Sequence, residues 1–435
     1  MQSQVKIFCC LALFVSVFTS LLTQAADLGW DVVKNEKIHI LEQSSAQGEV
    51  ISSYFPLAIN VGRWLYDWEP PTELKNAPNK IELESAQNTS QLTLTLRHLF
   101  IHFDLSDTKH FRKVWFEPKK GLKFRGIFGI HDFVKKRPFV IIRMGIHGNV
   151  DEFTAERFLA KAIYENLDAN FLMLENLTSH AFLANNTDFS FGGIDEGLQT
   201  FFTLQEIQKN QLNDIVSSYH LVGLSLGGHG VFVTTLLDQA NGQKIKSVVD
   251  FCPVINLKET QDFHLAPSLS NLGADLWNMM RLQSLYKRQG LEKEFSGIWE
   301  SLFDFKPRFV PAMMRVLNRD RKVPLLTFED MNSLNKNMRW PKGFAEHLQN
   351  SASFDELNEF WDLYQGVKTP FTIYTTPNDL LVPNEVNSER IFTGRQAGDF
   401  SSLKYVRLEK GFHCGISSVY KWDYVVELMS QGLNL

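Results

Sequence analysis

Short apolar runs that alternate with helix-like segments constrain the fold of this chain more than any other feature of its 435 residues. Two of these runs, at residues 139–142 and 171–174, are continuously apolar, which is typical of a strand buried on both faces. The runs lie at residues 139–142, 171–174, 220–224, 247–251, 371–375 and 403–408, and helical patterns lie at residues 197–208, 228–239 and 419–429. This alternation predicts the α/β class, with a mostly parallel sheet that helices cover on both faces.

The alternation also predicts how the chain is divided. It starts at Arg137, after strand-like stretches, and it stops for more than a hundred residues before it resumes at Phe371. The predicted parts are a signal peptide at 1–25, an N-terminal β-rich segment at 26–136 that opens the sheet, an α/β core at 137–255 and 370–435, and a mainly helical cap at 256–369 between core strands 6 and 7. Large apolar side chains in that cap, such as Trp277 and Met313, favour a dry, apolar entrance to a site.

The N-terminal residues have the pattern of a targeting segment. Lys6 precedes an apolar run at residues 7–22, and the small residues Thr23 and Ala25 suit cleavage after Ala25. The run is slightly short for a bilayer span, which takes about 20 apolar residues. We therefore expect a cleaved signal peptide and an exported protein, periplasmic or secreted, without an integral membrane span.

Charge and cysteine content limit the classes of partner and the kinds of site that the chain can have. The formal net charge is -5, and no basic cluster with interleaved aromatic residues occurs, so we expect no nucleic-acid partner. Removal of the signal peptide leaves two cysteines, Cys252 and Cys414. The sequence allows two interpretations of them, a disulfide or two buried free thiols. The chain holds neither a CxxC nor an HExxH motif, so we expect no metal site.

One serine lies between two glycines at the junction of a predicted strand and a predicted helix. The stretch from Gly223 to Gly227 reads Gly-Leu-Ser-Leu-Gly, the GxSxG pattern of a nucleophile elbow. Such a turn exposes the hydroxyl of Ser225 at the start of a helix, where the N–H of Leu226 points at a developing oxyanion. The alternative is a glycine-rich turn with a passive serine.

A serine nucleophile needs a base, and the base needs an acid to orient it. Asp379 follows the predicted strand at 371–375, and His413 lies in a loop after the last strand, so the order along the chain is serine, aspartate, histidine. Taken singly, Asp379 can be a turn residue and His413 a surface histidine. Asp250, at the end of another strand, is the alternative acid. We interpret His229, four residues after Ser225, as packing or pocket lining.

A second oxyanion donor is predicted at the end of the first buried strand. His147-Gly148 there has the pattern of a loop that supplies a backbone N–H. We assign this donor to Asn149, with Val150 as the alternative, and we expect His147 to hold the shape of the loop. An ordinary strand-to-helix turn is the competing interpretation.

With these residues in hand, the chain resembles the serine hydrolases of the α/β-hydrolase fold. The matching parts are His147-Gly148, residues 223–227, Asp379 with Leu381-Val382-Pro383, and His413. Residues 326–383 are similar to the YheT-like bacterial branch. The resemblance implies cleavage of a carboxylic ester, without a cofactor, on a small-molecule substrate. A peptidase or amidase with the same triad, and an idle binding protein of the cell envelope, are the alternatives.

Overall fold

The computed structural model describes most of the predicted core. The described residues are 30–41, 103, 105, 107, 109–150, 157–188, 190–266, 271, 324–359, 361–376, 379, 381–408, 413–414 and 422–435. The predicted signal peptide, most of the predicted N-terminal β-rich segment and half of the predicted cap lie outside them.

Nine strands form one sheet in the order β1-β2-β3-β5-β4-β6-β7-β8-β9. Neighbouring strands from β5 to β9 are all parallel, whereas β1, β2 and β3 join in antiparallel fashion at one edge. The strands are β1 (Ile38–Ile40), β2 (Phe111–Lys119), β3 (Leu122–Gly129), β4 (Arg137–Arg143), β5 (Asn170–Leu174), β6 (Val216–Leu224), β7 (Ile245–Phe251), β8 (Phe371–Thr375) and β9 (Leu403–Arg407). The predicted mostly parallel sheet is confirmed.

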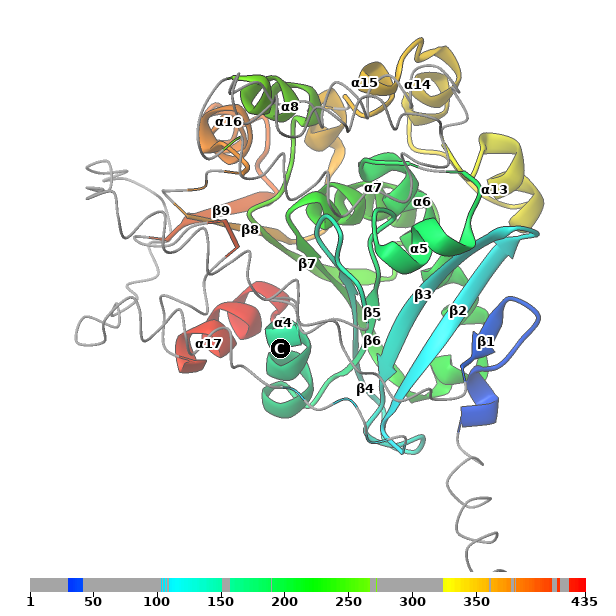
Figure 1. The fold of residues 1–435 in the computed structure, drawn as a ribbon. Coiled ribbons are helices and arrows are strands. Elements are labelled where there is room, and N and C mark those ends of the chain that lie inside the picture. Colours follow the sequence, from blue (N-terminus) through cyan, green and yellow to red (C-terminus); the bar gives the residue numbers. More distant parts are fainter. Residues whose placement is uncertain are drawn as a thin grey trace, which may run out of the picture.

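Helices cover both faces of this sheet (Figure 1). On one face lie α5 (His180–Asn185), α6 (Gly193–Lys209) and α7 (Leu226–Ala240), and on the other lie α4 (Arg157–Lys161), the π-helical turn η3 (Ala162–Asn166) and α17 (Trp422–Leu433). The remaining helices are η1 (Trp30–Val33), η4 (Gln211–Ile215), α8 (Leu257–Leu265), α13 (Phe328–Leu334), α14 (Phe344–Asn350), α15 (Phe354–Leu357), η5 (Trp361–Gly366), η6 (Asn384–Val386) and α16 (Ser388–Gln396). With its parallel core and antiparallel edge, the sheet has the α/β-hydrolase architecture that we predicted.

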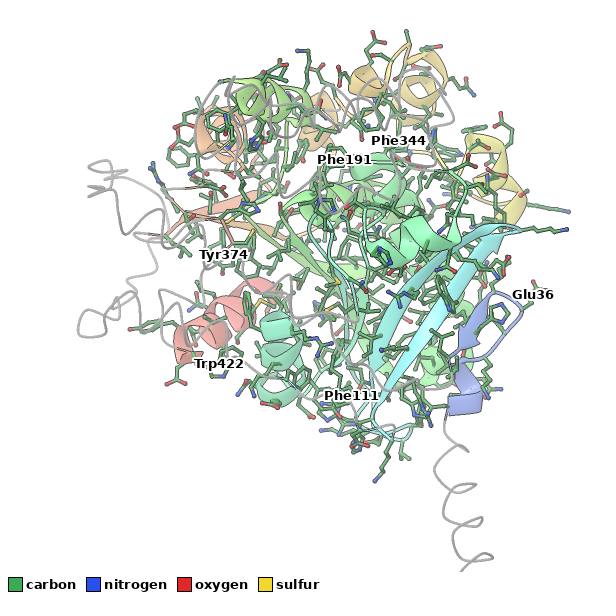
Figure 2. The ribbon with its side chains drawn as sticks, viewed as in Figure 1. Glu36, Phe111, Phe191, Phe344, Tyr374 and Trp422 are labelled. Atoms are coloured by element: carbon green, nitrogen blue, oxygen red, sulfur yellow. The ribbon has the colours of Figure 1, made fainter. Side chains whose placement is uncertain are left out.

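Two hydrophobic clusters, one on each face, hold the layers together. Phe191 and Phe344 belong to the cluster under α6 and α7, and Phe111 and Tyr374 belong to the one under α4 and α17 (Figure 2). Strand side chains alternate between the two faces, so each central strand contributes to both clusters. This is why β4 and β5 contain the continuously apolar runs that predicted them.

The segment predicted as a cap lies between β7 and β8 in the chain. Its described helices are α8, α13, α14, α15 and η5. This segment is joined to α6 at Leu325, whose backbone N–H donates to the buried carboxyl of Asp195. Among the described residues, no helix combines the length and the apolar character that a membrane crossing requires.

Candidate active site

Ser225 occupies a strained turn between β6 and α7. Its φ is 54° and its ψ is -121°, a backbone conformation that residues other than glycine rarely adopt. The turn is held by backbone hydrogen bonds: the N–H of Ser225 donates to Phe251 O at 2.9 Å, and Val254 N–H donates to Ser225 O at 3.2 Å. The predicted elbow is therefore present, and it is fixed to the end of the neighbouring strand β7.

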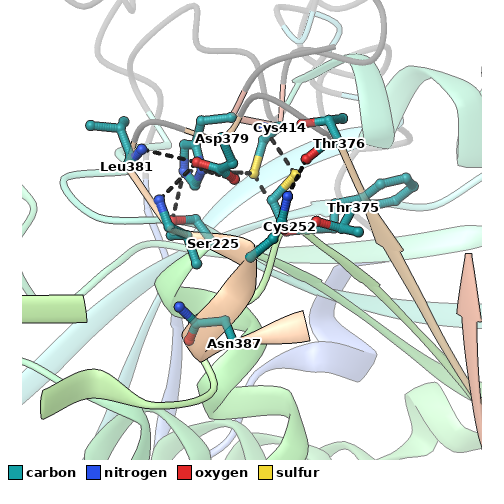
Figure 3. Close-up of polar contacts among 12 residues, drawn as sticks. Ser225, Cys252, Thr375, Thr376, Asp379, Leu381, Asn387 and Cys414 are labelled. Atoms are coloured by element: carbon teal, nitrogen blue, oxygen red, sulfur yellow. Dashed lines mark hydrogen bonds and ion pairs between the residues drawn. The ribbon is translucent and has the colours of Figure 1, made fainter. Parts of the chain in front are cut away.

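Ser225, His413 and Asp379 form one chain of hydrogen bonds (Figure 3). His413 Nε2 lies 2.9 Å from Ser225 Oγ, and His413 Nδ1 lies 2.8 Å and 2.9 Å from the two oxygens of Asp379. A carboxylate only accepts, so Nδ1 carries the proton and Nε2 is free to accept from the serine hydroxyl. The structure thus brings together the three side chains that the sequence predicted as a triad.

The loop after β8 holds Asp379 in place. Asp379 Oδ1 accepts the backbone N–H groups of Leu381 at 3.0 Å and Val382 at 2.7 Å. Farther along, Asn384 Nδ2 donates to Thr376 O at 2.5 Å and closes the loop. Asp379 is consequently both a turn residue and the partner of His413, so the two interpretations of this residue were not exclusive.

The alternative acid, Asp250, faces the first turn of α7 instead of His413. Its carboxyl lies against Gly228, where an added Cβ would sit 2.1 Å from Asp250 Oδ1. That oxygen has no hydrogen-bond partner among the described residues, and burial raises the pKa of Asp250 well above its usual range. Asp250 is therefore a packed side chain, and its burial favours the neutral form over the charged form.

The loop after β4 lies against the serine turn. An added Cβ on Gly227 would come within 2.3 Å of Arg143 O and 2.6 Å of Met144 O, so only glycine allows this approach. His147 has a positive φ of 62°, and its N–H donates to Thr178 Oγ1 at 2.7 Å. The structure thus gives His147 the loop-shaping position that we expected.

Asn176 and Thr178 connect this loop to the rest of the core. Thr178 Oγ1 donates to Asn176 Oδ1 at 2.6 Å, and Asn176 N–H donates to Gly148 O at 2.9 Å. Asn176 Nδ2 also donates to Met144 O at 3.2 Å and to Glu196 Oε1 at 2.7 Å. The loop is thereby held at both ends by two polar side chains that follow β5.

Two fully or nearly buried ion pairs complete the support. Arg143 Nε lies 3.2 Å from Glu196 Oε2, with both side chains inaccessible to solvent, and Arg125 Nε lies 3.1 Å from Glu175 Oε2. Burial raises the pKa of Glu196 to about 7, and the guanidinium of Arg143 opposes that shift. Arg125 Nη2 also donates to Asn149 Oδ1 at 2.6 Å, which fixes the residue predicted to supply an oxyanion N–H.

The remaining predicted residues lie nearby or in the core. Leu226 is the first residue of α7, where a helix N–H has no partner within the helix. Val150 is fully buried in the cluster under α4 and α17. His229 is buried between α6 and α7, where burial lowers its pKa to about 3, so it is a neutral packing residue. The oxyanion roles of Leu226 and Asn149 stay predictions.

Sequence reasoning missed the polar network around the loop. Glu175, Asn176, Thr178 and Ser179 follow the apolar run of β5 directly, and such a concentration of polar residues after a buried strand was the available signal. Arg143 and Glu196 gave no comparable signal, because a charged residue in a strand or helix is usually exposed.

Comparison with known proteins adds little beyond the fold. No protein-family model matches the sequence, and no curated protein is significantly similar to it. Among solved structures, an esterase from Pyrococcus furiosus is similar at 11% identity and a TM-score of 0.45, over 76% of this chain and 96% of that one. An esterase from Pyrobaculum calidifontis is similar at 12% identity and a TM-score of 0.43, over 79% of this chain and 89% of that one. An acylaminoacyl peptidase from Pyrococcus horikoshii is similar at 11% identity and a TM-score of 0.41, over 74% of this chain and 42% of that one. At these values the likeness bears on neither activity nor substrate.

Exchange of the two candidate acids for asparagine distinguishes them. Asp379→Asn keeps an oxygen for the amides of Leu381 and Val382 but offers its amide group to His413, which favours the wrong tautomer. We expect kcat on a p-nitrophenyl ester to fall by about 10³–10⁴. Asp250→Asn replaces a neutral group by one of the same shape, so kcat should stay within about threefold. The opposite ranking, with both variants folded by circular dichroism, would make Asp250 the acid.

Thr178 offers a test of the loop support. Thr178→Val removes the acceptor of the His147 N–H and leaves that donor buried, so we expect a loss of about 1–3 kcal/mol in the free energy of unfolding by urea. Because the loop then relaxes, kcat should fall about tenfold or more while KM changes little. Thr178→Ser keeps the hydroxyl and serves as the matched control, with kcat near that of the wild type. An unchanged kcat in Thr178→Val would show that this contact does not position the loop.

Proposed function

We propose that this chain is a serine hydrolase that cleaves carboxylic esters through an acyl-enzyme on Ser225. The observation that carries the proposal is the continuous hydrogen-bonded chain from Ser225 Oγ through His413 to Asp379. A serine hydroxyl is a weak nucleophile unless a base takes its proton, and this arrangement supplies the base and orients it.

The reaction follows from these positions. Ser225 Oγ attacks the ester carbonyl while His413 Nε2 accepts its proton, and Asp379 stabilises the imidazolium that forms. The N–H groups of Leu226 and Asn149 stabilise the oxyanion, a contribution of about 3 kcal/mol for each donor. His413 then protonates the leaving alcohol, and water, activated by the same imidazole, releases the acid and restores Ser225.

The end of α8 supports a substrate with an apolar part. Phe263 and Leu265 are 39% and 41% exposed, which is unusual for large apolar side chains among the described residues. Between them, His264 Nε2 lies 2.7 Å from Leu381 O, in the loop that carries Asp379. Because these apolar side chains flank a contact with the acid loop, we propose that they meet the acyl or alcohol chain of the substrate.

Two further parts of the proposal come from the sequence. The pattern of residues 1–25 supports export to the periplasm or the medium. The segment 326–383 supports a relationship to the YheT-like branch of α/β-hydrolases. Both are proposals about the origin and location of the protein, and the reaction at Ser225 depends on neither.

Labelling with a fluorophosphonate tests the nucleophile. We expect the purified wild type to gain the mass of one adduct and Ser225→Ala to gain none. Ser217→Ala, which removes an exposed serine near the start of β6, should label like the wild type. No adduct on the folded wild type would contradict the proposal and favour the binding protein. Turnover of aminoacyl anilides without turnover of esters would favour the peptidase.

A series of p-nitrophenyl esters tests the apolar substrate. From acetate to octanoate, kcat/KM should rise by up to about fourfold per added CH₂ until the chain fills the site, since each buried CH₂ contributes about 0.8 kcal/mol. Phe263→Ala should reduce kcat/KM for octanoate more than for acetate. Val134→Ala, at a side chain 88% exposed before β4, is the matched control and should change neither. A preference for acetate in the wild type would refute this substrate class.

A further inference from the structure

Two cysteines far apart in the sequence meet beside the catalytic histidine. Cys252 follows β7 directly, and Cys414 follows His413, at a separation of 162 positions. The backbone N–H of Cys414 donates to Cys252 Sγ at 3.1 Å (Figure 3). The two sulfur atoms and a ring nitrogen of His413 all lie within 4.8 Å of one another. The pairing that the sequence left open is therefore within geometric reach.

Both cysteines occupy an unusual backbone conformation. The φ of Cys252 is 48° and that of Cys414 is 49°, in the left-handed region where residues other than glycine are uncommon. Both side chains are also buried, with 1% and 5% exposed. Strain of this kind persists where the surroundings over-determine it. Here it occurs at both residues whose sulfur atoms lie within 4.8 Å of one another.

A metal ion explains this cluster less well than a bond between the sulfur atoms. Both ring nitrogens of His413 already have partners, Asp379 and Ser225. An ion bound here would have to displace the histidine from one of them.

We propose that Cys252 and Cys414 form an intramolecular disulfide that fixes the His413 loop to the end of β7. The oxidant is a low-molecular-weight disulfide such as oxidised glutathione. The thiolate of Cys414, the more exposed of the two, attacks one of its sulfur atoms and releases one small thiol, which leaves a mixed disulfide on Cys414. Cys252 then displaces the second small thiol. Two protein thiols and one small disulfide thus give one protein disulfide and two small thiols.

The position of the bond gives it a structural consequence. Phe251, immediately before Cys252, accepts the N–H of Ser225, so the end of β7 already holds the serine turn. A disulfide to Cys414 would anchor the neighbour of His413 to the same point. The nucleophile and its base would then be tied to one strand end, and unfolding of the histidine loop would be opposed because the bond closes a very long loop of the unfolded chain.

Peptide mapping and thermal unfolding of the full chain test the proposal without reference to enzymatic activity. After incubation with oxidised glutathione and alkylation in denaturant, we expect a peptide that links Cys252 to Cys414 and disappears on reduction. The unfolding temperature of the oxidised wild type should exceed that of the reduced form by roughly 5 °C or more. Cys252→Ala and Cys414→Ala should give no linked peptide, and their unfolding temperatures should not respond to glutathione.

Two results would overturn the proposal. One is full alkylation of both cysteines in the oxidised wild type, which would leave them as buried thiols. The other is protection of both thiols by equimolar Zn²⁺, reversed by a chelator and absent from the alanine variants, with no linked peptide under oxidation. That result would assign the cluster to a metal. Neither result depends on whether Ser225 reacts with a fluorophosphonate, so a failure here is distinct from a failure of the proposed hydrolase.

Discussion

The close approach of α7 to the end of β4 is the constraint on which the candidate site depends. At Gly227 the helix backbone lies so near Arg143 O that a Cβ would be 2.3 Å away. That contact sets the serine turn beside the loop containing His147 and Asn149. Without it, the hydroxyl of Ser225 and the loop predicted to stabilise an oxyanion would belong to separate parts of the sheet edge. The strained φ of Ser225 follows from the same constraint, since the chain must reverse within one residue to enter α7.

The polar network behind the loop carries an energetic cost that packing alone would avoid. Two ion pairs, Arg143 with Glu196 and Arg125 with Glu175, are buried in a core where apolar side chains of the same size would often be at least as stable. These ion pairs provide directional contacts, because each group donates or accepts along a fixed line. Together with Asn176, they define the positions of Met144 O, Gly148 O and the Asn149 side chain. The proposed oxyanion donor, a backbone N–H in this loop, would need such directional contacts to stay at a fixed point, because apolar contacts tolerate sliding.

The fold and the candidate triad could be predicted from the sequence, because both depend on local sequence patterns. The strand predicted at residues 371–375 is β8 exactly as observed, and the helix predicted from residue 228 begins two residues earlier, directly after Ser225. Ser225, Asp379 and His413 each follow a strand, so the order of strands was enough to bring them together. The network of Arg125, Glu175 and Glu196 could not be predicted in this way. Its contacts join β3, the residues after β5, and α6, and no periodicity in one segment indicates a partner in another.

The two candidate aspartates show why the environment, and not the residue type, assigns the role. Asp379 receives two backbone N–H groups and the imidazole of His413, so a negative charge there is compensated on every side. Asp250 is also buried, but it lies against Gly228 without a donor on Oδ1 among the described residues, and burial raises its pKa, which favours the neutral form. A neutral carboxyl cannot stabilise an imidazolium. The same side chain at the end of two strands is therefore suited to the proposed role of orienting acid in one place and packs beneath the serine turn in the other.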